Sequence, residues 1–352
     1  MTTPPLELRT LSPGGQTALE VARQLVEYLD AARRSLEIAL YDVRLPGEPG
    51  DLVANALREA HERGVAVRLA YNGDYGNRVP VPPPPRTKPE LLEALPIETR
   101  GIPGIPDLMH HKYAVRDGGS VWSGSTNWTS DSWELQENVI LIAHDADAAA
   151  SFTRNFEELW QRGSVEASGF EQPTLFDLAG TQARAWFTPG HGPELSARIA
   201  SAIGRAKRRV RVASPVITAG AVIGTLAQVA ADDRVDLRGV VDRPQMEQVF
   251  RQWRQNPRSA WKIPILSSVF EHADFKGKPS TPYGPDTPHD FMHAKVTVAD
   301  DDVFCGSFNL SRSGEQNAEN VLELQDPELA ERLAAFIDAT RDRYGPMTVP
   351  PA

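Results

Sequence analysis

The sequence has little cysteine and no long apolar run. Cys305 is the single cysteine among 352 residues. One cysteine excludes an intrachain disulfide framework and is typical of a reducing compartment, so we predict that it is a small buried side chain. No apolar run approaches the roughly 20 residues that cross a bilayer, and residues 1–7 lack the basic and apolar regions of a secretory signal. We therefore expect a cytoplasmic protein without an integral membrane segment.

An excess of positive charge is also absent. The formal net charge is −10 and the pI is about 5.4. Proteins that coat polyanions nonspecifically bind by neutralising phosphates, so this composition argues against that class and requires a local basic site for any anionic ligand. Five histidines show no metal-ligand spacing with one another or with Cys305: His61, His144, His191, His272 and His289. We predict no metal and no cofactor.

One polar motif occurs twice. Its first part is H-x-K, four residues and then Asp, and its second part is G-S-x-N. The first copy comprises His110, Lys112, Asp117, Gly124, Ser125 and Asn127, and the second comprises His293, Lys295, Asp300, Gly306, Ser307 and Asn309. A matching order in two distant places indicates an internal repeat.

The repeat extends over most of the chain. Residues 11–14 and 187–190 open the two halves, and the periodicity then predicts a helix, a strand, a second helix and a second strand in each. The expected ranges are 18–32, 36–41, 52–63 and 65–70 in the first half, and 195–206, 210–213, 222–231 and 235–241 in the second. Basic residues at 33–34 and 207–209 follow the first helix, where a helix C-terminus favours cations. A strand–helix–strand order predicts parallel pairing.

Each half is expected to close with a strand and a helix, over 137–142 and 148–160, then over 319–324 and 328–344. Residues 163–180 read as a linker, with the boundary near Pro173. We therefore expect domains at 1–172 and 173–352. The halves diverge at a proline-rich connector, 80–85, and at residues 276–290, which fit either a wall of an active-site mouth or a bare surface loop.

The motif histidine and lysine are predicted to share a face. Residues 109–115 favour a strand, in which positions i and i+2 point the same way, so His110 and Lys112 lie together. Asp117 has the opposite parity and precedes a Gly-Gly turn, so we expect it away from the substrate. His111 also points away from Lys112, which favours a histidine of the core or one that only supports the site.

A two-residue turn would pair Asp117 with Ser120, and a three-residue turn would pair Ala299 with Val303. These registers place the motif residues opposite one another as His110 with Asn127, Lys112 with Ser125, His293 with Asn309, and Lys295 with Ser307. Each hairpin then offers an imidazole, an ammonium, a hydroxyl and an amide on one face. That set suits an anion whose chemistry needs a nitrogen nucleophile or a proton donor.

Two glutamates stand ten residues after the motif asparagines, Glu137 after Asn127 and Glu319 after Asn309. A carboxylate there is placed to hold a histidine Nδ1 and leave Nε2 free, although an exposed charge at a strand end is the default for either residue alone. Trp122 is assigned to packing. Trp128 and Trp133 fit either a pocket or the core, and the core is favoured.

These motifs resemble those of the phospholipase D superfamily, and the resemblance covers nearly the whole chain. It implies an α/β fold of two α/β/α sandwich domains with mixed sheets, related by a pseudo-twofold axis, with both His-Lys pairs at the interface. It also implies that one histidine forms a phosphohistidine while the other protonates the leaving alcohol. The residues that match the catalytic sets are His110, Lys112, Asn127 and Glu137, and His293, Lys295, Asn309 and Glu319. Ser125 and Ser307 are expected to bind substrate, and Asp117 and Asp300 to be structural.

We predict a metal-independent phosphodiesterase that cleaves phospholipid head-group esters. Hydrolysis is favoured over transfer to another alcohol, and by resemblance His110 is the favoured nucleophile. The alternative is an endonuclease that cuts DNA or RNA by the same mechanism, whereas two intact catalytic sets disfavour a catalytically dead scaffold. Because one chain carries both half-sites, we expect a monomer.

Overall fold

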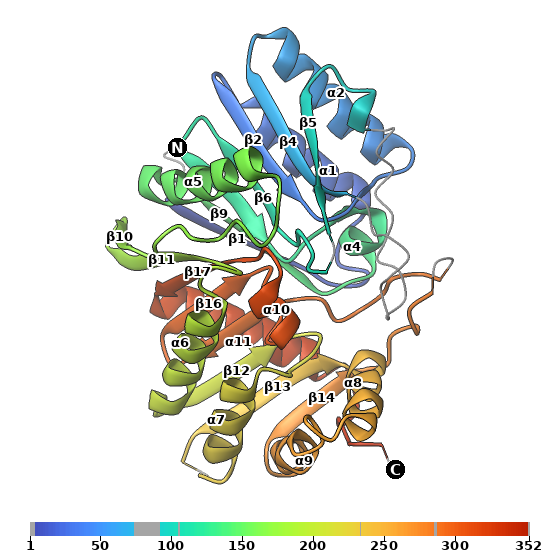
Figure 1. The fold of residues 1–352 in the computed structure, drawn as a ribbon, viewed down its shortest axis with the longest axis vertical. Coiled ribbons are helices and arrows are strands. Elements are labelled where there is room, and N and C mark those ends of the chain that lie inside the picture. The colour runs from blue at the N-terminus through green and yellow to red at the C-terminus, as the bar shows by residue number, and fades with distance from the viewer. Residues whose placement is uncertain (1–3, 74–91, 105, 233, 285–286, 351–352) are drawn as a thin grey trace.

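The computed structural model describes residues 4–73, 92–104, 106–232, 234–284 and 287–350. The proline-rich segment 80–85 lies outside these ranges. The described residues form one large mixed sheet in each half (Figure 1). In spatial order, the first sheet contains β1 (Leu6–Leu11), β9 (Asn138–Ala143), β7 (Ser120–Gly124), β6 (Lys112–Arg116), β2 (Ser35–Leu40), β4 (Ala66–Gly73) and β5 (Glu98–Pro103). The second contains β10 (Leu175–Leu178), β11 (Thr181–Phe187), β17 (Asn320–Gln325), β16 (Asp302–Gly306), β15 (Val296–Ala299), β12 (Arg209–Ala213), β13 (Asp236–Asp242) and β14 (Asp274–Lys278).

The two sheets have the same strand order once the edge strand β10 is set aside. The predicted strand–helix–strand units pair in parallel, β2 with β4 and β12 with β13, while each motif hairpin pairs antiparallel with its neighbours. This arrangement confirms the α/β class, the mixed sheets and the internal repeat.

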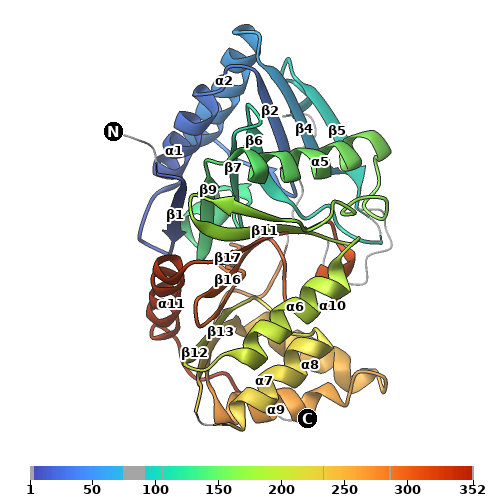
Figure 2. The ribbon, with the colours of Figure 1, turned by 90° about the vertical axis from the view of Figure 1, so that its left-hand side faces the viewer.

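Helices cover both faces of each sheet (Figures 1 and 2). The outer faces carry α1 (Ala18–Asp30) and α2 (Glu48–Glu62) in the first half, and α6 (Gly192–Arg205), α7 (Gly220–Ala230), α8 (Arg243–Gln255) and α9 (Lys262–His272) in the second. The inner faces carry α5 (Ala146–Arg162) and α11 (Pro327–Arg341). The shorter elements are β3 (Val43–Arg44), β8 (Trp128–Thr129), α4 (Ser130–Glu134) and α10 (Arg312–Gln316).

The inner faces share one buried apolar layer. Val139 and Leu141 of β9 belong to the same cluster as Leu322 and Leu324 of β17, together with residues of α5 and α11. Burial of this layer brings the closing strand of each half to the interface, which is where the sequence after each motif leads. The boundary near Pro173 stays a prediction, and the second sheet begins with β10 just after it.

Local signals explain where several helices begin and end. Thr17 and Glu20 form a capping box at the start of α1, and Gly163 ends α5 in the left-handed conformation with φ 65°. The predicted helices and strands lie within a few residues of the observed ones. The helix expected over 328–344 ends at Arg341, so that Tyr344 lies beyond it.

Several elements were not predicted. The strands β1 and β11 precede the opening segments of the repeat, and α8 and α9 separate β13 from β14. Residues 276–290 were predicted as an insertion, but residues 276–278 belong to β14.

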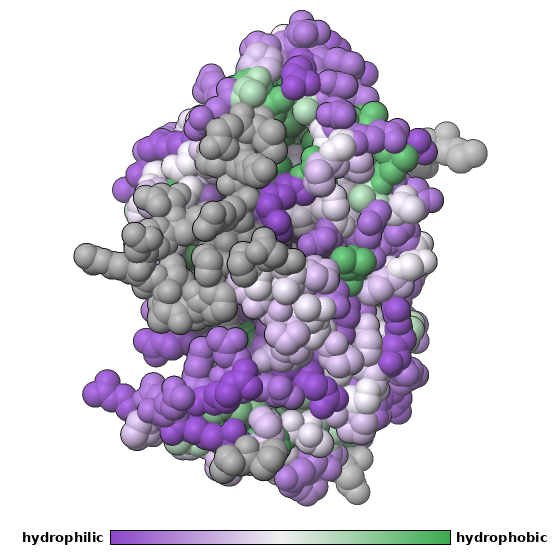
Figure 3. Space-filling model, turned by 90° about the vertical axis from the view of Figure 1, so that its right-hand side faces the viewer, coloured by the Kyte–Doolittle hydropathy of each residue, from purple (hydrophilic) through white to green (hydrophobic). Residues whose placement is uncertain are grey.

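No helix within the described ranges is long and apolar enough to cross a membrane. The face of the molecule in Figure 3 is mostly hydrophilic, with apolar residues in small separate groups.

Candidate active site

Both motif hairpins differ by one residue from the predicted register. In the first, Arg116 pairs with Ser120, which leaves a three-residue turn that includes Asp117. In the second, Ala299 pairs with Asp302 across a two-residue turn. The strand expected over 109–115 also starts later, because β6 begins at Lys112. The motif histidines and asparagines therefore lie beyond the regular ladders, and the predicted direct pairings were wrong.

The motif aspartates explain the shift. Asp117 has a φ of 57° and Asp300 a φ of 53°, so both adopt the left-handed conformation of a turn. The carboxylate of Asp117 accepts hydrogen bonds from the backbone amides of residues 33–35, and that of Asp300 from the amides of residues 207–209. The basic runs thus supply backbone donors to the motif aspartates. The expectation that these aspartates are structural is confirmed.

The two histidines meet because each is bonded to the opposite half. The backbone amide of His110 donates to Ala318 at 2.9 Å, and that of His293 donates to the Glu137 carbonyl at 3.2 Å. In each half, the residues just before the motif strand thus pair with the residues just before the closing strand of the opposite half. This exchange places both histidines at the interface between the halves.

His110 contacts the glutamate of the second half. Its Nδ1 lies 2.8 Å from Oε2 of Glu319, which is fully buried. Burial raises the pKa of Glu319 to about 7, opposed by Lys112 and by hydrogen bonds that include one from Asn317. Burial and the neighbouring ammonium groups of Lys112 and Lys295 hold the pKa of His110 well below its ordinary value. With Nδ1 engaged by the carboxylate, Nε2 of His110 is the nitrogen available for reaction.

The second histidine has a different partner. Nδ1 of His293 lies 3.1 Å from Oδ1 of Asn138, not at a carboxylate. The carboxylate of Glu137 instead accepts hydrogen bonds from Lys278 at 2.8 Å and from the Tyr344 hydroxyl. The two half-sites are therefore related in their backbone but unequal in their charges.

The motif lysines are buried cations beside the histidines. Nζ of Lys112 donates to the His110 carbonyl and Nζ of Lys295 to the His293 carbonyl, each at 2.6 Å. Burial lowers the pKa of Lys112 to about 7, against the attraction of Glu319, and burial followed by repulsion from Lys112 lowers that of Lys295 well below its ordinary value. Two ammonium groups that repel each other in a buried site are suited to bind an anion.

The motif serines and asparagines surround this cluster. The hydroxyls of Ser125 and Ser307 accept from the backbone amides of Val139 and Asn320 at 3.0 Å and so fix the start of each closing strand. Oδ1 of Asn127 and of Asn309 is buried without a hydrogen-bond partner among the described residues. The asparagine amides are thus not fully used by the fold, whereas the substrate contact predicted for the serine hydroxyls stays a prediction.

Sequence reasoning missed several neighbours of the histidines. Asn138 follows Glu137 in the same way that Asn320 follows Glu319, so the repeat held a signal for both. The centroid of the Tyr41 ring lies 4.6 Å from that of His110 and 4.9 Å from Nζ of Lys112, and the sequence marked Tyr41 only as the last residue of the first predicted strand.

The residues assigned to packing are buried. His111 is fully buried, its Nδ1 lies 3.2 Å from Oδ1 of Asn320, and burial lowers its pKa to about 4. Three tryptophans, Trp122, Trp128 and Trp133, belong to the outer core of the first half, and Cys305 is buried in the shared layer. These assignments are confirmed. Within the described ranges, no group of three or more His, Cys, Asp or Glu side chains could hold a metal ion.

The sequence model described as "Cardiolipin synthase, PLD-like domain" matches residues 25–160 and 199–340, most of both halves. The chain belongs to the phospholipase D-like family. The resemblance predicted from the paired motifs is thereby confirmed.

Two curated relatives are cardiolipin hydrolases described as mitochondrial. The protein of Canis lupus familiaris is 30% identical over 162 residues, which cover 45% of this chain and 56% of the relative. That of Xenopus laevis is 32% identical over 148 residues, which cover 40% of this chain and 60% of the relative. The match thus spans little more than half the length of each relative. The phosphatidylserine synthase of Haemophilus influenzae Rd KW20 has the same fold, with a TM-score of 0.65 and 13% identity over 96% of this chain and 86% of that protein.

Proposed function

We propose that this phospholipase D-like protein is a metal-independent phosphodiesterase that hydrolyses phospholipid head-group esters through a phosphohistidine. The observation that carries the proposal is the arrangement of His110 and His293, brought together from the two halves, with a carboxylate on Nδ1 of only one of them. An imidazole whose Nδ1 donates to a carboxylate presents a basic Nε2, and that carboxylate stabilises the positive charge that develops on the ring.

In the first step, Nε2 of His110 attacks the phosphorus, and the bond between phosphorus and the leaving alcohol breaks. His293 donates a proton to the leaving oxygen. The ammonium groups of Lys112 and Lys295, with the amides of Asn127 and Asn309, bind the non-bridging oxygens. Burial and nearby cations lower the pKa of His293 in the free site. A bound phosphate anion offsets those cations, so that substrate binding itself favours the protonated, donating form of His293.

In the second step, a water oxygen attacks the phosphorus and gives its proton to His293. The phosphorus–nitrogen bond breaks, and its electron pair returns to Nε2 of His110. Another alcohol in place of water would give transfer instead of hydrolysis. We assign Glu137 a positioning role, because its carbonyl accepts the hydrogen bond from the His293 backbone amide and its carboxylate is held by Lys278.

The relatives support a phospholipid substrate, since the two described above are named for cardiolipin hydrolysis. Both half-sites lie in one chain, so the proposed unit of activity is a monomer. A cytoplasmic location stays a prediction.

The test is a substrate screen with the purified protein. Mixed micelles that contain one phospholipid class at a time, and single- and double-stranded DNA and RNA, are assayed for released alcohol or cut strands. We expect turnover of phospholipid that is lost in His110→Ala and His293→Ala and retained in His61→Ala, which removes an exposed imidazole on α2. Cleavage of nucleic acid without turnover of phospholipid would overturn the substrate class and favour the endonuclease alternative.

A further inference from the structure

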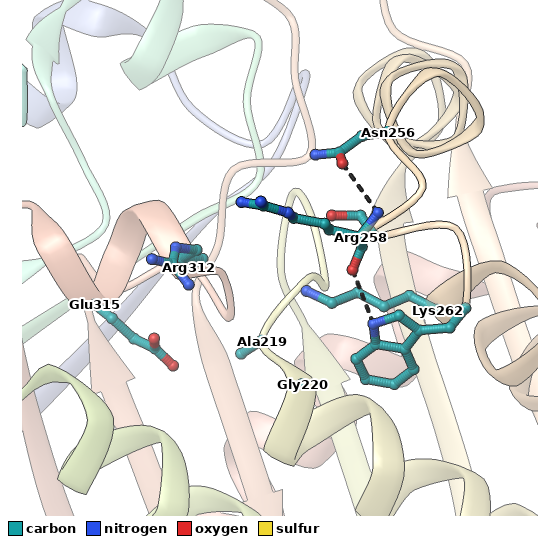
Figure 4. Close-up of a pocket in the computed structure, with 9 residues that line it drawn as sticks. Ala219, Gly220, Asn256, Arg258, Lys262, Arg312 and Glu315 are labelled. Carbon is teal, nitrogen blue, oxygen red and sulfur yellow. Dashed lines mark hydrogen bonds between the residues drawn. The ribbon is translucent and has the colours of Figure 1, made fainter.

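A basic cavity of about 520 Å³ lies in the second half, away from the histidines, between α7, α10 and the turn that joins α8 to α9. Its cations are Arg258 from that turn, Lys262 from the first position of α9, and Arg312 from the first position of α10. In Figure 4 the side chains of Arg258 and Lys262 extend toward Arg312. Three cations therefore converge on one hollow.

Their charge is only partly offset by the fold, because three cations face a single carboxylate. Within the described part of the chain, none of the three makes an ion pair within 4 Å, and the one carboxylate that lines the cavity is that of Glu315. Burial lowers the pKa of Lys262 and the charge of Arg312 lowers it further, while the carboxylate of Glu315 opposes the shift without reversing it. Cations that repel one another across a cavity are stabilised by a bound anion.

Hydrogen bonds join the residues that line the cavity to the chain segment after the catalytic motif. Thr218 accepts a hydrogen bond from Nζ of Lys262 on its carbonyl at 2.7 Å and one from the Arg312 amide on its hydroxyl at 3.3 Å. Its own amide donates at 2.7 Å to the carbonyl of Leu310, the residue after Asn309. Arg312 follows Asn309 by three residues, a chain segment that spans at most about 11 Å. The lining of the cavity thus includes the chain segment that follows the motif asparagine.

The fold does not require these charges. Arg312 stands three residues after Asn309, and the residue three after Asn127 is Ser130. The two positions are equivalent, since each begins the short helix after its motif. In the first half this helix faces a different neighbour, because Asp131 accepts a hydrogen bond from the backbone amide of His289. The cation cluster belongs to the second half and points to a ligand group on that side alone.

The rim carries an exposed aromatic ring. Trp261 is 51% exposed, and its Nε1 donates to the carbonyl of Arg258 at 3.0 Å, which fixes the indole beside the cations. A fixed indole next to cations suits an amphiphile, whose phosphate meets the charges while its apolar part meets the ring. A ring beside cations also suits a stacked base, so the choice of a lipid follows from the proposed phospholipase activity.

We propose that this cavity binds a second phosphate group of a phospholipid substrate while its scissile phosphate lies between His110 and His293. This assignment rests on the proposed phospholipase activity. It narrows the substrate class to phospholipids with two phosphate groups joined by a short linker, and it makes Arg258, Lys262 and Arg312 specificity-determining residues.

The test compares one-phosphate and two-phosphate lipids. Wild type and the double variant Arg258→Gln/Arg312→Gln are assayed on phosphatidylglycerol and on cardiolipin, at equal mole fractions in neutral detergent micelles. A charged hydrogen bond to phosphate is worth about tenfold or more, so we expect kcat/KM on cardiolipin to fall by roughly 10²-fold and that on phosphatidylglycerol by less than about threefold. The control is Arg251→Gln, which removes an exposed charge of α8 that does not line the cavity.

An equal loss on both lipids, or no loss on either, would overturn the second-phosphate site while leaving the phospholipase activity in place. A selective loss on single-stranded DNA would assign the cavity to a nucleic-acid backbone instead. If wild type turns over neither lipid, the proposed function fails, and the cavity is tested by itself with inorganic phosphate. We then expect a fluorescence change that disappears both in Trp261→Phe and in the double variant, and its persistence in the double variant would refute the site.

Discussion

The contact between His110 and Glu319 makes a quantitative prediction for Glu319→Gln. The substitution keeps a side chain of the same size and an oxygen that accepts from Nδ1, but it removes the negative charge. Formation of the phosphohistidine puts positive charge on the ring, and the carboxylate stabilises that charge across the 2.8 Å contact. The variant should therefore be slow in the first chemical step.

The expected loss follows from Coulomb's law. Two unit charges whose centres lie about 4 Å apart attract by about 4 kcal/mol at an effective dielectric constant near 20. This energy corresponds to roughly 10³-fold in rate. Because burial raises the pKa of Glu319 to about 7, the carboxylate is charged only above that pH. Ionisation of Glu319 should give the wild-type rate a rising limb near pH 7, which Glu319→Gln should lose, and the bound phosphate anion keeps Lys112 protonated through that limb.

The assay is rapid-quench measurement of the first turnover at about pH 8, with Glu137→Gln as the matched variant from the other half. The carboxylate of Glu137 contacts Lys278 and Tyr344, not a histidine ring. We expect Glu137→Gln to slow the first turnover by about tenfold or less. It should also lower the stability of the fold, since Lys278 loses a charged partner. Equal losses in the two variants would refute the assignment of unequal half-sites.

Three further predictions concern the rest of the site. Lys112→Met should abolish turnover and raise the free energy of unfolding by roughly 1–3 kcal/mol at neutral pH, because burial lowers the lysine pKa to about 7. The unfolded state then binds more protons between about pH 7 and pH 10, so urea melts should show wild type gaining stability as the pH rises through that interval, and the variant should not. Asp117→Ala should lower stability by about 1–3 kcal/mol, because three backbone amides lose their acceptor, while turnover per folded molecule is kept within about tenfold. Full activity should persist in EDTA, and loss on chelation that a divalent ion restores would contradict the metal-independent mechanism.

The sequence was sufficient for the repeat and for the identity of most site residues. Periodicity located the helices and strands of both halves, because each buries one apolar face. The doubled motif singled out His110, Lys112, His293 and Lys295, and the structure brings these four together. Short-range patterns and repetition carry this information.

Contacts between distant segments could not be predicted in the same way. The sequence paired each histidine with the motif of its own half. In the structure, backbone hydrogen bonds cross between the halves and place Glu319 beside His110. The hydrogen bonds of Glu137 with Lys278 and Tyr344 depend on where the second sheet ends. No local sequence pattern indicates that position. The hairpin registers were missed because Asp117 and Asp300 leave the ladder to bind backbone amides of a remote segment.

The most direct test of the account is to trap the covalent intermediate. Wild type is mixed with a phospholipid that carries labelled phosphate, denatured during the first turnover under alkaline conditions that preserve phosphohistidine, and digested for peptide mapping. We expect label on the peptide that contains His110, none on the peptide that contains His293, and none in His110→Ala. Label on His293 would reverse the roles of the two histidines, and rapid turnover without label on either would contradict the phosphohistidine mechanism.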